Sequence, residues 1–260
     1  MYPENVILPD NMLKYGLKMW DQNYDLFSEA VALFNDARID FIELYYSPET
    51  LPDYQKLALL KDIPITIHAT HDFGFREFIF KDAQLEIWRN TQKLADFFAA
   101  PYIVVHAGLT TKFSDWAVNL RQIDDPRIII ENMAAYDLFD QKMYGHSLVE
   151  LQEIHSLKPI CFDFEKAVKA ACSQNIPHQL FVEQCIKILQ PFYFHLSGGD
   201  KDSPRDEHLN LWESNIDFAW IKKILLKLAQ KKKIYLVFET PKIYDDLNND
   251  LKNINYFKKI

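Results

Sequence analysis

The sequence predicts one α/β domain over residues 1–260, a closed (β/α)8 TIM barrel. Eight short apolar runs alternate with segments of helical periodicity, which is the repeat of such a barrel. The runs are rich in β-branched and aromatic residues, as strands that are buried on both faces are. No Gly/Ser tract, low-complexity segment or break in composition separates two domains. An open doubly wound sheet is the alternative that the same alternation allows.

Each strand is predicted from one of these apolar runs. In chain order, the runs are residues 15–20, 40–46, 64–69, 102–107, 127–132, 159–164, 192–197 and 234–239. The first helix is predicted from the three-to-four spacing of Phe27, Ala30, Val31 and Phe34. Patterns of the same kind place the later helices at residues 52–61, 82–99, 111–121, 147–156, 177–189, 216–230 and 243–257.

The composition is that of a globular protein from a reducing compartment. The hydrophobic fraction of 48% suffices for a large core, and the longest apolar runs fall far short of the ~20 residues that span a bilayer. The N-terminus lacks the basic and apolar regions of a signal peptide. Cys161, Cys172 and Cys185 are an odd set of cysteines without CxxC spacing, which favours reduced thiols. We therefore expect a cytoplasmic protein without a membrane segment.

Seven of the eight predicted strands carry a carboxylate or an imidazole at or near the C-terminal end. These residues are Glu43, His68, His106, Glu131, Asp163, His195 and Glu239. In a parallel barrel all such ends face one mouth, so these side chains should converge there although they are scattered along the chain. Oxygen and imidazole donors without cysteine suit Mn, Zn, Mg or Fe(II). The sequence therefore predicts a divalent metal at the mouth.

The strongest part of this pattern is a set of four residues that end four consecutive strands. They are Glu131, Asp163, His195 and Glu239. Three carboxylates at such close range repel one another unless a cation neutralises them. A metal ion removes that cost, whereas a metal-free mouth would require carboxyl groups with strongly raised pKa values. We therefore predict that these four side chains coordinate one divalent cation.

These motifs resemble the xylose isomerase-like barrels, a superfamily that includes sugar epimerases and endonuclease IV (AP endonuclease family 2). The resemblance covers essentially the whole chain. It implies one divalent metal, commonly Mn in the epimerases, on the four residues above, and proton transfer next to a carbonyl by Glu131 and Glu239. The endonuclease IV pattern implies further zinc ligands. They fall here on His68, His106, Asp206 and His208.

The chain also departs from the endonuclease IV pattern. Lys166 stands in CFDFEKA where the families have a histidine, and a protonated lysine cannot bind a metal. We expect its ammonium group to replace a third metal and to pair with Asp206. Trp212 stands in place of a glycine-rich turn, which favours a closed pocket for a small ligand. The predicted substrate contacts are therefore Trp212, Glu43 and His71, which stands where a tyrosine is usual.

Two classes of enzyme fit these residues. The first, which we prefer, is an isomerase or epimerase of a small sugar or sugar phosphate that works through an enediolate, with Glu131, Glu239 and Lys166 in catalysis. The alternative is an endonuclease IV-like phosphoester hydrolase with two or more zinc ions, which His68 and His106 favour. A barrel that binds a ligand without catalysis is a weaker third interpretation, because the four-residue metal set is intact.

The net charge of the chain indicates which class of partner it binds. The net charge of −8 disfavours broad contact with the phosphate backbone of nucleic acid, because such contact depends on Lys and Arg. The one dense basic cluster, residues 231–233, precedes the eighth predicted strand and should lie at the end of the barrel opposite the mouth. We therefore expect a small carbohydrate as the partner, with nucleic acid as the less favoured alternative. Assembly into a homo-oligomer stays open.

Overall fold

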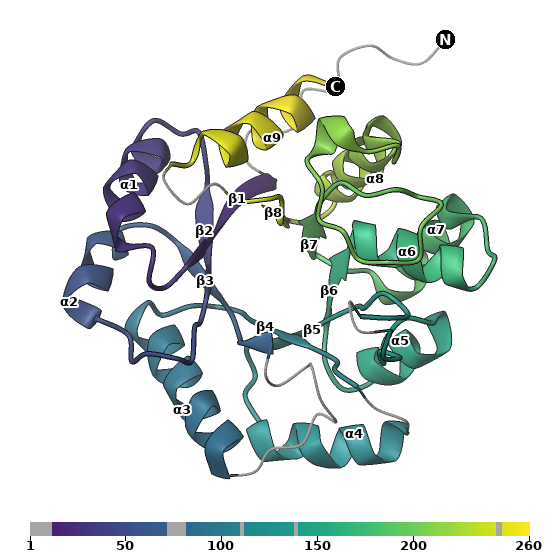
Figure 1. Ribbon diagram of the computed structural model, residues 1–260, viewed down its shortest axis with the longest axis horizontal. Helices are drawn as coiled ribbons and strands as arrows, with labels where there is room; N and C mark the ends of the chain where they lie inside the picture. Colours follow the sequence, from purple (N-terminus) through teal and green to yellow (C-terminus); the bar gives the residue numbers. More distant parts are fainter. Residues whose placement is uncertain (1–11, 72–81, 110–111, 138–139, 243–245) are drawn as a thin grey trace.

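Eight parallel strands close into a barrel in the order of the sequence, with β8 paired to β1. The structure, a computed structural model, describes residues 12–71, 82–109, 112–137, 140–242 and 246–260. Figure 1 views the barrel along its axis, with the strands in a central ring and the helices around it. The prediction of a single-domain (β/α)8 TIM barrel is therefore confirmed, and the open doubly wound sheet is wrong.

Each predicted strand is present, and each ends within two residues of its predicted end. The strands are β1 Leu13–Trp20, β2 Phe41–Tyr45, β3 Ile65–His68, β4 Ile103–His106, β5 Ile128–Glu131, β6 Ile160–Asp163, β7 Tyr193–Leu196 and β8 Ile234–Phe238. The parallel register aligns neighbouring ends, since His106 pairs with Glu131 and Asp163 pairs with His195. This alignment brings the polar end residues to one level of the barrel.

The helices cover the outside of the barrel. They are α1 Phe27–Asn35, α2 Tyr54–Leu57, α3 Asp82–Phe97, α4 Phe113–Leu120, α5 Leu148–His155, α6 Phe164–Ser173, α7 His178–Leu189, α8 Phe218–Ala229 and α9 Asn248–Lys259, with short 3-10 segments η1 Tyr24–Leu26, η2 Ala58–Leu60, η4 Arg121–Ile123 and η5 Leu211–Glu213. The last helix begins later than predicted, at Asn248, and residues 111 and 243–245 of the predicted ranges lie outside the described part of the chain. None of the described helices has both the length and the apolar character needed to cross a bilayer.

Helix α6 is an element that the sequence analysis did not predict. It starts immediately after β6, because the Asp163 side chain accepts a hydrogen bond from the backbone N–H of Lys166 and so caps the first turn. The helix buries Glu165, Lys166 and Lys169 together with its apolar residues. The segment was not recognised because one helix was expected between β6 and β7, and the pattern at residues 177–189 filled that place.

A packed layer fills the barrel beneath the mouth. It consists of Phe41, Val104, Ile129, Cys161, Tyr193 and Val237, drawn from six different strands. Gly16 makes room for it, because a Cβ atom there would lie 2.4 Å from the Phe41 ring. Above this layer, the Tyr193 hydroxyl donates a hydrogen bond to Glu43 Oε2 at 2.7 Å. This layer closes the barrel below the mouth.

Candidate metal centre

The four predicted metal ligands meet at the ends of four adjacent strands. Glu131 ends β5, Asp163 ends β6, His195 lies in β7 and Glu239 follows β8. One ligand atom from each side chain lies within 4.8 Å of those of the others. All four residues are buried. The structure therefore brings together the set that the sequence analysis proposed.

His195 lies between three carboxylates. Its Nδ1 atom is 3.0 Å from Glu131 Oε1 and 3.0 Å from Glu239 Oε1, while its Nε2 atom is 3.0 Å from Glu43 Oε2. Burial lowers the pKa of His195, but nearby acidic groups, these three glutamates among them, raise it well above its usual range. Such an imidazole has to lose its proton before it can bind a metal.

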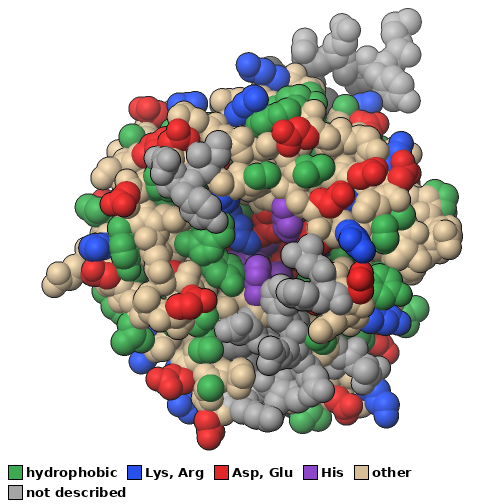
Figure 2. Space-filling model, viewed as in Figure 1, with side chains coloured by type: hydrophobic (Ala, Val, Ile, Leu, Met, Phe, Trp, Pro, Cys, Tyr) green, Lys and Arg blue, Asp and Glu red, His purple; other side chains and the backbone are tan. Residues whose placement is uncertain are grey.

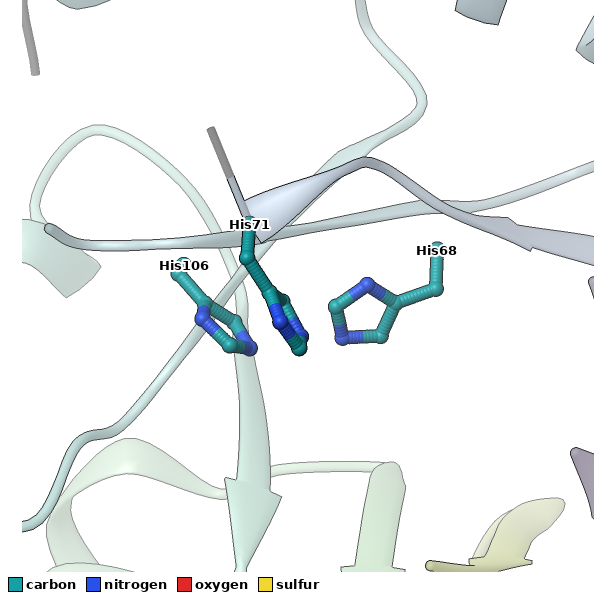
Figure 3. A group of neighbouring side chains, drawn as sticks. All are labelled: His68, His71 and His106. Atoms are coloured by element: carbon teal, nitrogen blue, oxygen red, sulfur yellow. The ribbon is translucent and has the colours of Figure 1, made fainter. Parts of the chain in front are cut away.

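A second group of donors lies beside the first. His68, His71 and His106 hold ligand atoms within 4.8 Å of one another, and Figure 3 shows the three imidazole rings grouped together. Glu131 Oε2 lies 3.2 Å from His68 Nε2 and 2.9 Å from His106 Nε2, so Glu131 of the first group also contacts two members of the second. Burial lowers the pKa of His106 to about 4 and that of His71 well below its usual range. Neutral imidazoles of this kind are able to accept a metal ion.

Lys166 does not take the position that was predicted for it. Its Nζ atom donates a hydrogen bond to Glu131 Oε1 at 2.6 Å instead of pairing with Asp206. The first turn of α6 places the side chain over the mouth, within reach of β5. Burial alone would raise the pKa of Glu131. The nearby charges, first of Lys166 and then of His195 and His106, outweigh burial and hold this pKa well below its usual range.

Lys18 is a residue of the mouth that the sequence analysis missed. It lies near the end of β1, the one strand for which no ionisable end residue was named. Its ammonium group forms an ion pair with Glu239 and lies 3.5 Å from Glu43 Oε1. The signal was its place in YGLKMW, two residues before the strand ends. With Lys18 included, every strand of the barrel contributes an ionisable side chain near the mouth.

Asp206 and His208 lie in the long connection after β7. His208 Nε2 is 3.0 Å from Asp206 Oδ1, and His208 Nδ1 is 3.0 Å from the backbone oxygen of Glu239. This pairing raises the pKa of His208 to about 10, although burial opposes it. The connection is anchored by the buried Lys169, which donates to the Asp200 carbonyl at 2.7 Å and to Glu207 Oε2 at 2.6 Å. These two predicted ligands therefore adjoin Glu239 but pair with each other.

Two of the three predicted substrate contacts do not line the cavity at the mouth. Glu43 is fully buried, held by His195 and by the Tyr193 hydroxyl, and does not line the cavity at the mouth. Trp212 lies in η5 against α9, where Lys252 Nζ is 3.7 Å from its ring centroid, and it also lies away from that cavity. Asn253 of α9 holds this segment there, since it accepts a hydrogen bond from the Leu211 N–H and donates one to Asn210 Oδ1. His71 does line the cavity.

The mouth opens into a cavity of about 530 Å³. Its polar floor includes Lys18, His106, Lys166 and Glu239, and Figure 2 shows histidine and charged side chains at the bottom of a central hollow. The walls are mainly apolar or aromatic and include Trp20, Tyr45, Met133, Tyr136 and Met143. A polar floor under apolar walls is typical of a pocket for a small ligand.

The first group of donors fits a divalent cation. Asp163 Oδ1 accepts the backbone N–H of Lys166, while the buried Oδ2 atom accepts no hydrogen bond from the described residues. Burial, together with the charges of Glu131 and Glu239, raises the pKa of Asp163 to about 6, although Lys166 acts in the opposite direction. A cation bound among these carboxylates would relieve this repulsion and satisfy the open oxygen.

No protein-family model and no curated protein sequence matches this chain. Solved structures do resemble it. Endonuclease IV from Thermus thermophilus matches with a TM-score of 0.71 and 16% identity over 95% of this chain and 98% of that one, and AP endonuclease family 2 from Brucella melitensis with a TM-score of 0.61 and 12% identity over the same shares. A β-mannanase from Thermomonospora fusca matches with a TM-score of 0.52 and 12% identity over 93% and 85% of the two chains.

The two higher-scoring of these structures are barrels of the kind that the sequence resembles. The mannanase shows that the same barrel also serves other chemistry, so this likeness concerns the fold. The resemblance to the xylose isomerase-like barrels that include endonuclease IV is thereby confirmed at the level of architecture.

Proposed function

We propose that this chain is a divalent-metal-dependent isomerase or epimerase of a small sugar or sugar phosphate. The observation that carries the proposal is the set Glu131, Asp163, His195 and Glu239, whose donor atoms lie within 4.8 Å of one another at the mouth of the barrel. Carboxylate and imidazole donors in this combination suit Mn, Zn or Mg. Metal binding by these four residues is itself part of the proposal.

In this proposal, the two glutamates of the set move protons. A bound divalent cation would stabilise the negative charge that develops on the substrate's oxygens when a proton leaves the neighbouring carbon. His195 Nδ1 lies 3.0 Å from a carboxylate oxygen of each glutamate, so the two carboxylates meet at this nitrogen. In the proposal, one of Glu131 and Glu239 removes the proton from carbon and the other returns a proton on the opposite face. Lys166 keeps Glu131 ionised, as a base has to be.

The cavity supports a small substrate. Its volume of about 530 Å³ accommodates a single small molecule. Aromatic side chains of its wall, Trp20, Tyr45 and Tyr136, offer flat apolar faces for the C–H groups of a sugar ring. His71 and Lys166 also line the cavity and would orient the hydroxyl groups.

The test is proton exchange at carbon. Metal-loaded protein is incubated in heavy water with a panel of aldoses, ketoses and their phosphates, and deuterium incorporation next to the carbonyl is followed by NMR. The proposal expects exchange on at least one compound that stops after metal removal. Absence of metal-dependent exchange across the panel would count against an isomerase.

A second candidate function is a phosphoester hydrolase, as the likeness to endonuclease IV suggests. The group His68, His71 and His106 favours it, because this group offers donors for a second ion next to Glu131. Two ions that share a carboxylate are typical of enzymes that activate water for attack on phosphorus. Metal-dependent cleavage of an oligonucleotide with one abasic site, without proton exchange on any sugar, would select this function.

A further inference from the structure

Six ionisable side chains lie near His195 at the bottom of the mouth, and we call them the inner ring. This inner ring consists of the carboxylates of Glu43, Glu131, Asp163 and Glu239 and the ammonium groups of Lys18 and Lys166. The four acidic residues and Lys166 are buried, and the Lys18 side chain is only 11% exposed. At this depth, charges are poorly screened by water, so the net charge of the ring governs which ions it accepts.

The charge of the inner ring matches one divalent cation. Four carboxylates face two ammonium groups, which leaves two negative charges when the imidazoles are neutral, as metal binding requires. One divalent cation neutralises them. A second divalent cation would leave two positive charges in a buried site, and the inner ring has no further carboxylate to balance them.

The geometry points the same way, because each ammonium group occupies a carboxylate that a further cation would need. Lys166 Nζ lies 2.6 Å from Glu131 Oε1, the residue whose other oxygen faces His68 and His106. Lys18 pairs with Glu239 and lies 3.5 Å from Glu43. The three-histidine group in Figure 3 therefore has Glu131 as its nearby carboxylate, and Lys166 already shares it.

We infer that Lys166 takes the place of a second divalent cation. The mouth then holds one divalent cation per chain, and the group His68, His71 and His106 holds none while Lys166 is present. This inference rests on the proposed metal site and determines how many ions that site accepts. It also makes Lys166 the residue that separates a one-ion mouth from a two-ion mouth.

The experiment counts zinc ions in the folded chain. Wild type, Lys166→Met, Lys166→His and Lys18→Met are purified, saturated with zinc, passed through gel filtration and analysed by native mass spectrometry. Circular dichroism confirms that each is folded, and zinc is present throughout, so that a variant that depends on the metal for folding is still measured. Lys14→Met is the matched control, because Lys14 lies on the same strand as Lys18 but pairs with Asp40 at the opposite end of the barrel.

The inference predicts one zinc ion per chain in the wild type and in Lys14→Met, and two in Lys166→Met and Lys166→His. Lys18→Met is also expected to bind one ion, because Lys166 still pairs with Glu131 in that variant. Two or more ions in the wild type, or one ion in every variant at saturating zinc, would overturn the inference alone. A wild-type chain with no bound ion would contradict the proposed function as well.

Discussion

The Lys166 ammonium lies 2.6 Å from Glu131 Oε1, inside the mouth of the barrel. Glu131 also contacts His68, His106 and His195, so one carboxylate joins both groups of metal donors to the one lysine of α6 that reaches them. A change at Glu131 should therefore affect metal binding, proton transfer and the electrostatic balance of the mouth at the same time.

Glu131→Gln is expected to lower turnover by about 10²–10⁴-fold, because glutamine keeps the shape but supplies neither a charged ligand nor a base. The measurement is the rate on any substrate that the wild type converts, together with the bound metal. Glu86→Gln, an exposed residue of α3, is the control and should retain the wild-type values. Near-normal turnover of Glu131→Gln would show that Glu131 is neither ligand nor base.

Lys166→Met is expected to destabilise the metal-free protein by ~3–5 kcal/mol, because it leaves Glu131 buried without its partner charge. Zinc should restore most of this loss, since a bound cation then balances the carboxylate. Unfolding by urea, with chelator and with saturating zinc, measures both values. Equal stability of Lys166→Met and wild type in chelator would mean that the pair contributes nothing to the fold.

His195→Ala and His106→Ala should differ in the number of bound ions. His195 belongs to the set that we propose to hold the ion, whereas His106 belongs to the three-histidine group. Loss of the ion is expected in His195→Ala, and an unchanged count in His106→Ala. Elemental analysis of both variants decides this, and an ion lost from His106→Ala would favour the two-ion hydrolase.

Asp21 provides a prediction about pH that does not depend on the metal. Burial raises the pKa of Asp21 to about 6, although the backbone N–H of Ser47 donates to its Oδ1 atom. The folded state therefore holds this proton more tightly than the unfolded chain does. As pH rises through the range of about 4 to 6, the folded protein is progressively penalised, and above it the penalty is constant.

Asp21→Asn removes that penalty while its amide oxygen still accepts the Ser47 N–H. At pH 7 the variant should gain up to ~3 kcal/mol in the free energy of unfolding, and this gain should vanish as pH falls from about 6 to 4. Urea unfolding of both proteins at several pH values gives the difference. A difference independent of pH, or a less stable variant at pH 7, would contradict the assignment.

The positions of the strand ends could be predicted from sequence because barrel geometry fixes them. An apolar run that ends in a carboxylate or imidazole places that group at the mouth, and Glu131, Asp163, His195 and Glu239 met there for this reason. Barrel geometry does not determine the cytoplasmic location or the assembly into a homo-oligomer, and both stay predictions.

The pairing of charges could not be predicted in the same way. Which carboxylate Lys166 contacts depends on its reach from the first turn of α6, a helix that the sequence analysis did not predict. Lys18 was missed because the strand-end pattern was defined by metal donors, and an ammonium group is not one. Trp212 was misplaced because the path of the long connection after β7 has no periodic pattern that fixes it.

The most direct test of the central claim is the position of the ion. A crystal of manganese-loaded protein, with anomalous diffraction, locates it without any assumption about the substrate. The account predicts one manganese ion with Glu131, Asp163, His195 and Glu239 all within about 2.0–2.6 Å of it, and Lys18 and Lys166 beside it without contact to the metal. No ion among these four side chains, or an ion held instead by His68, His71 and His106, would contradict the account.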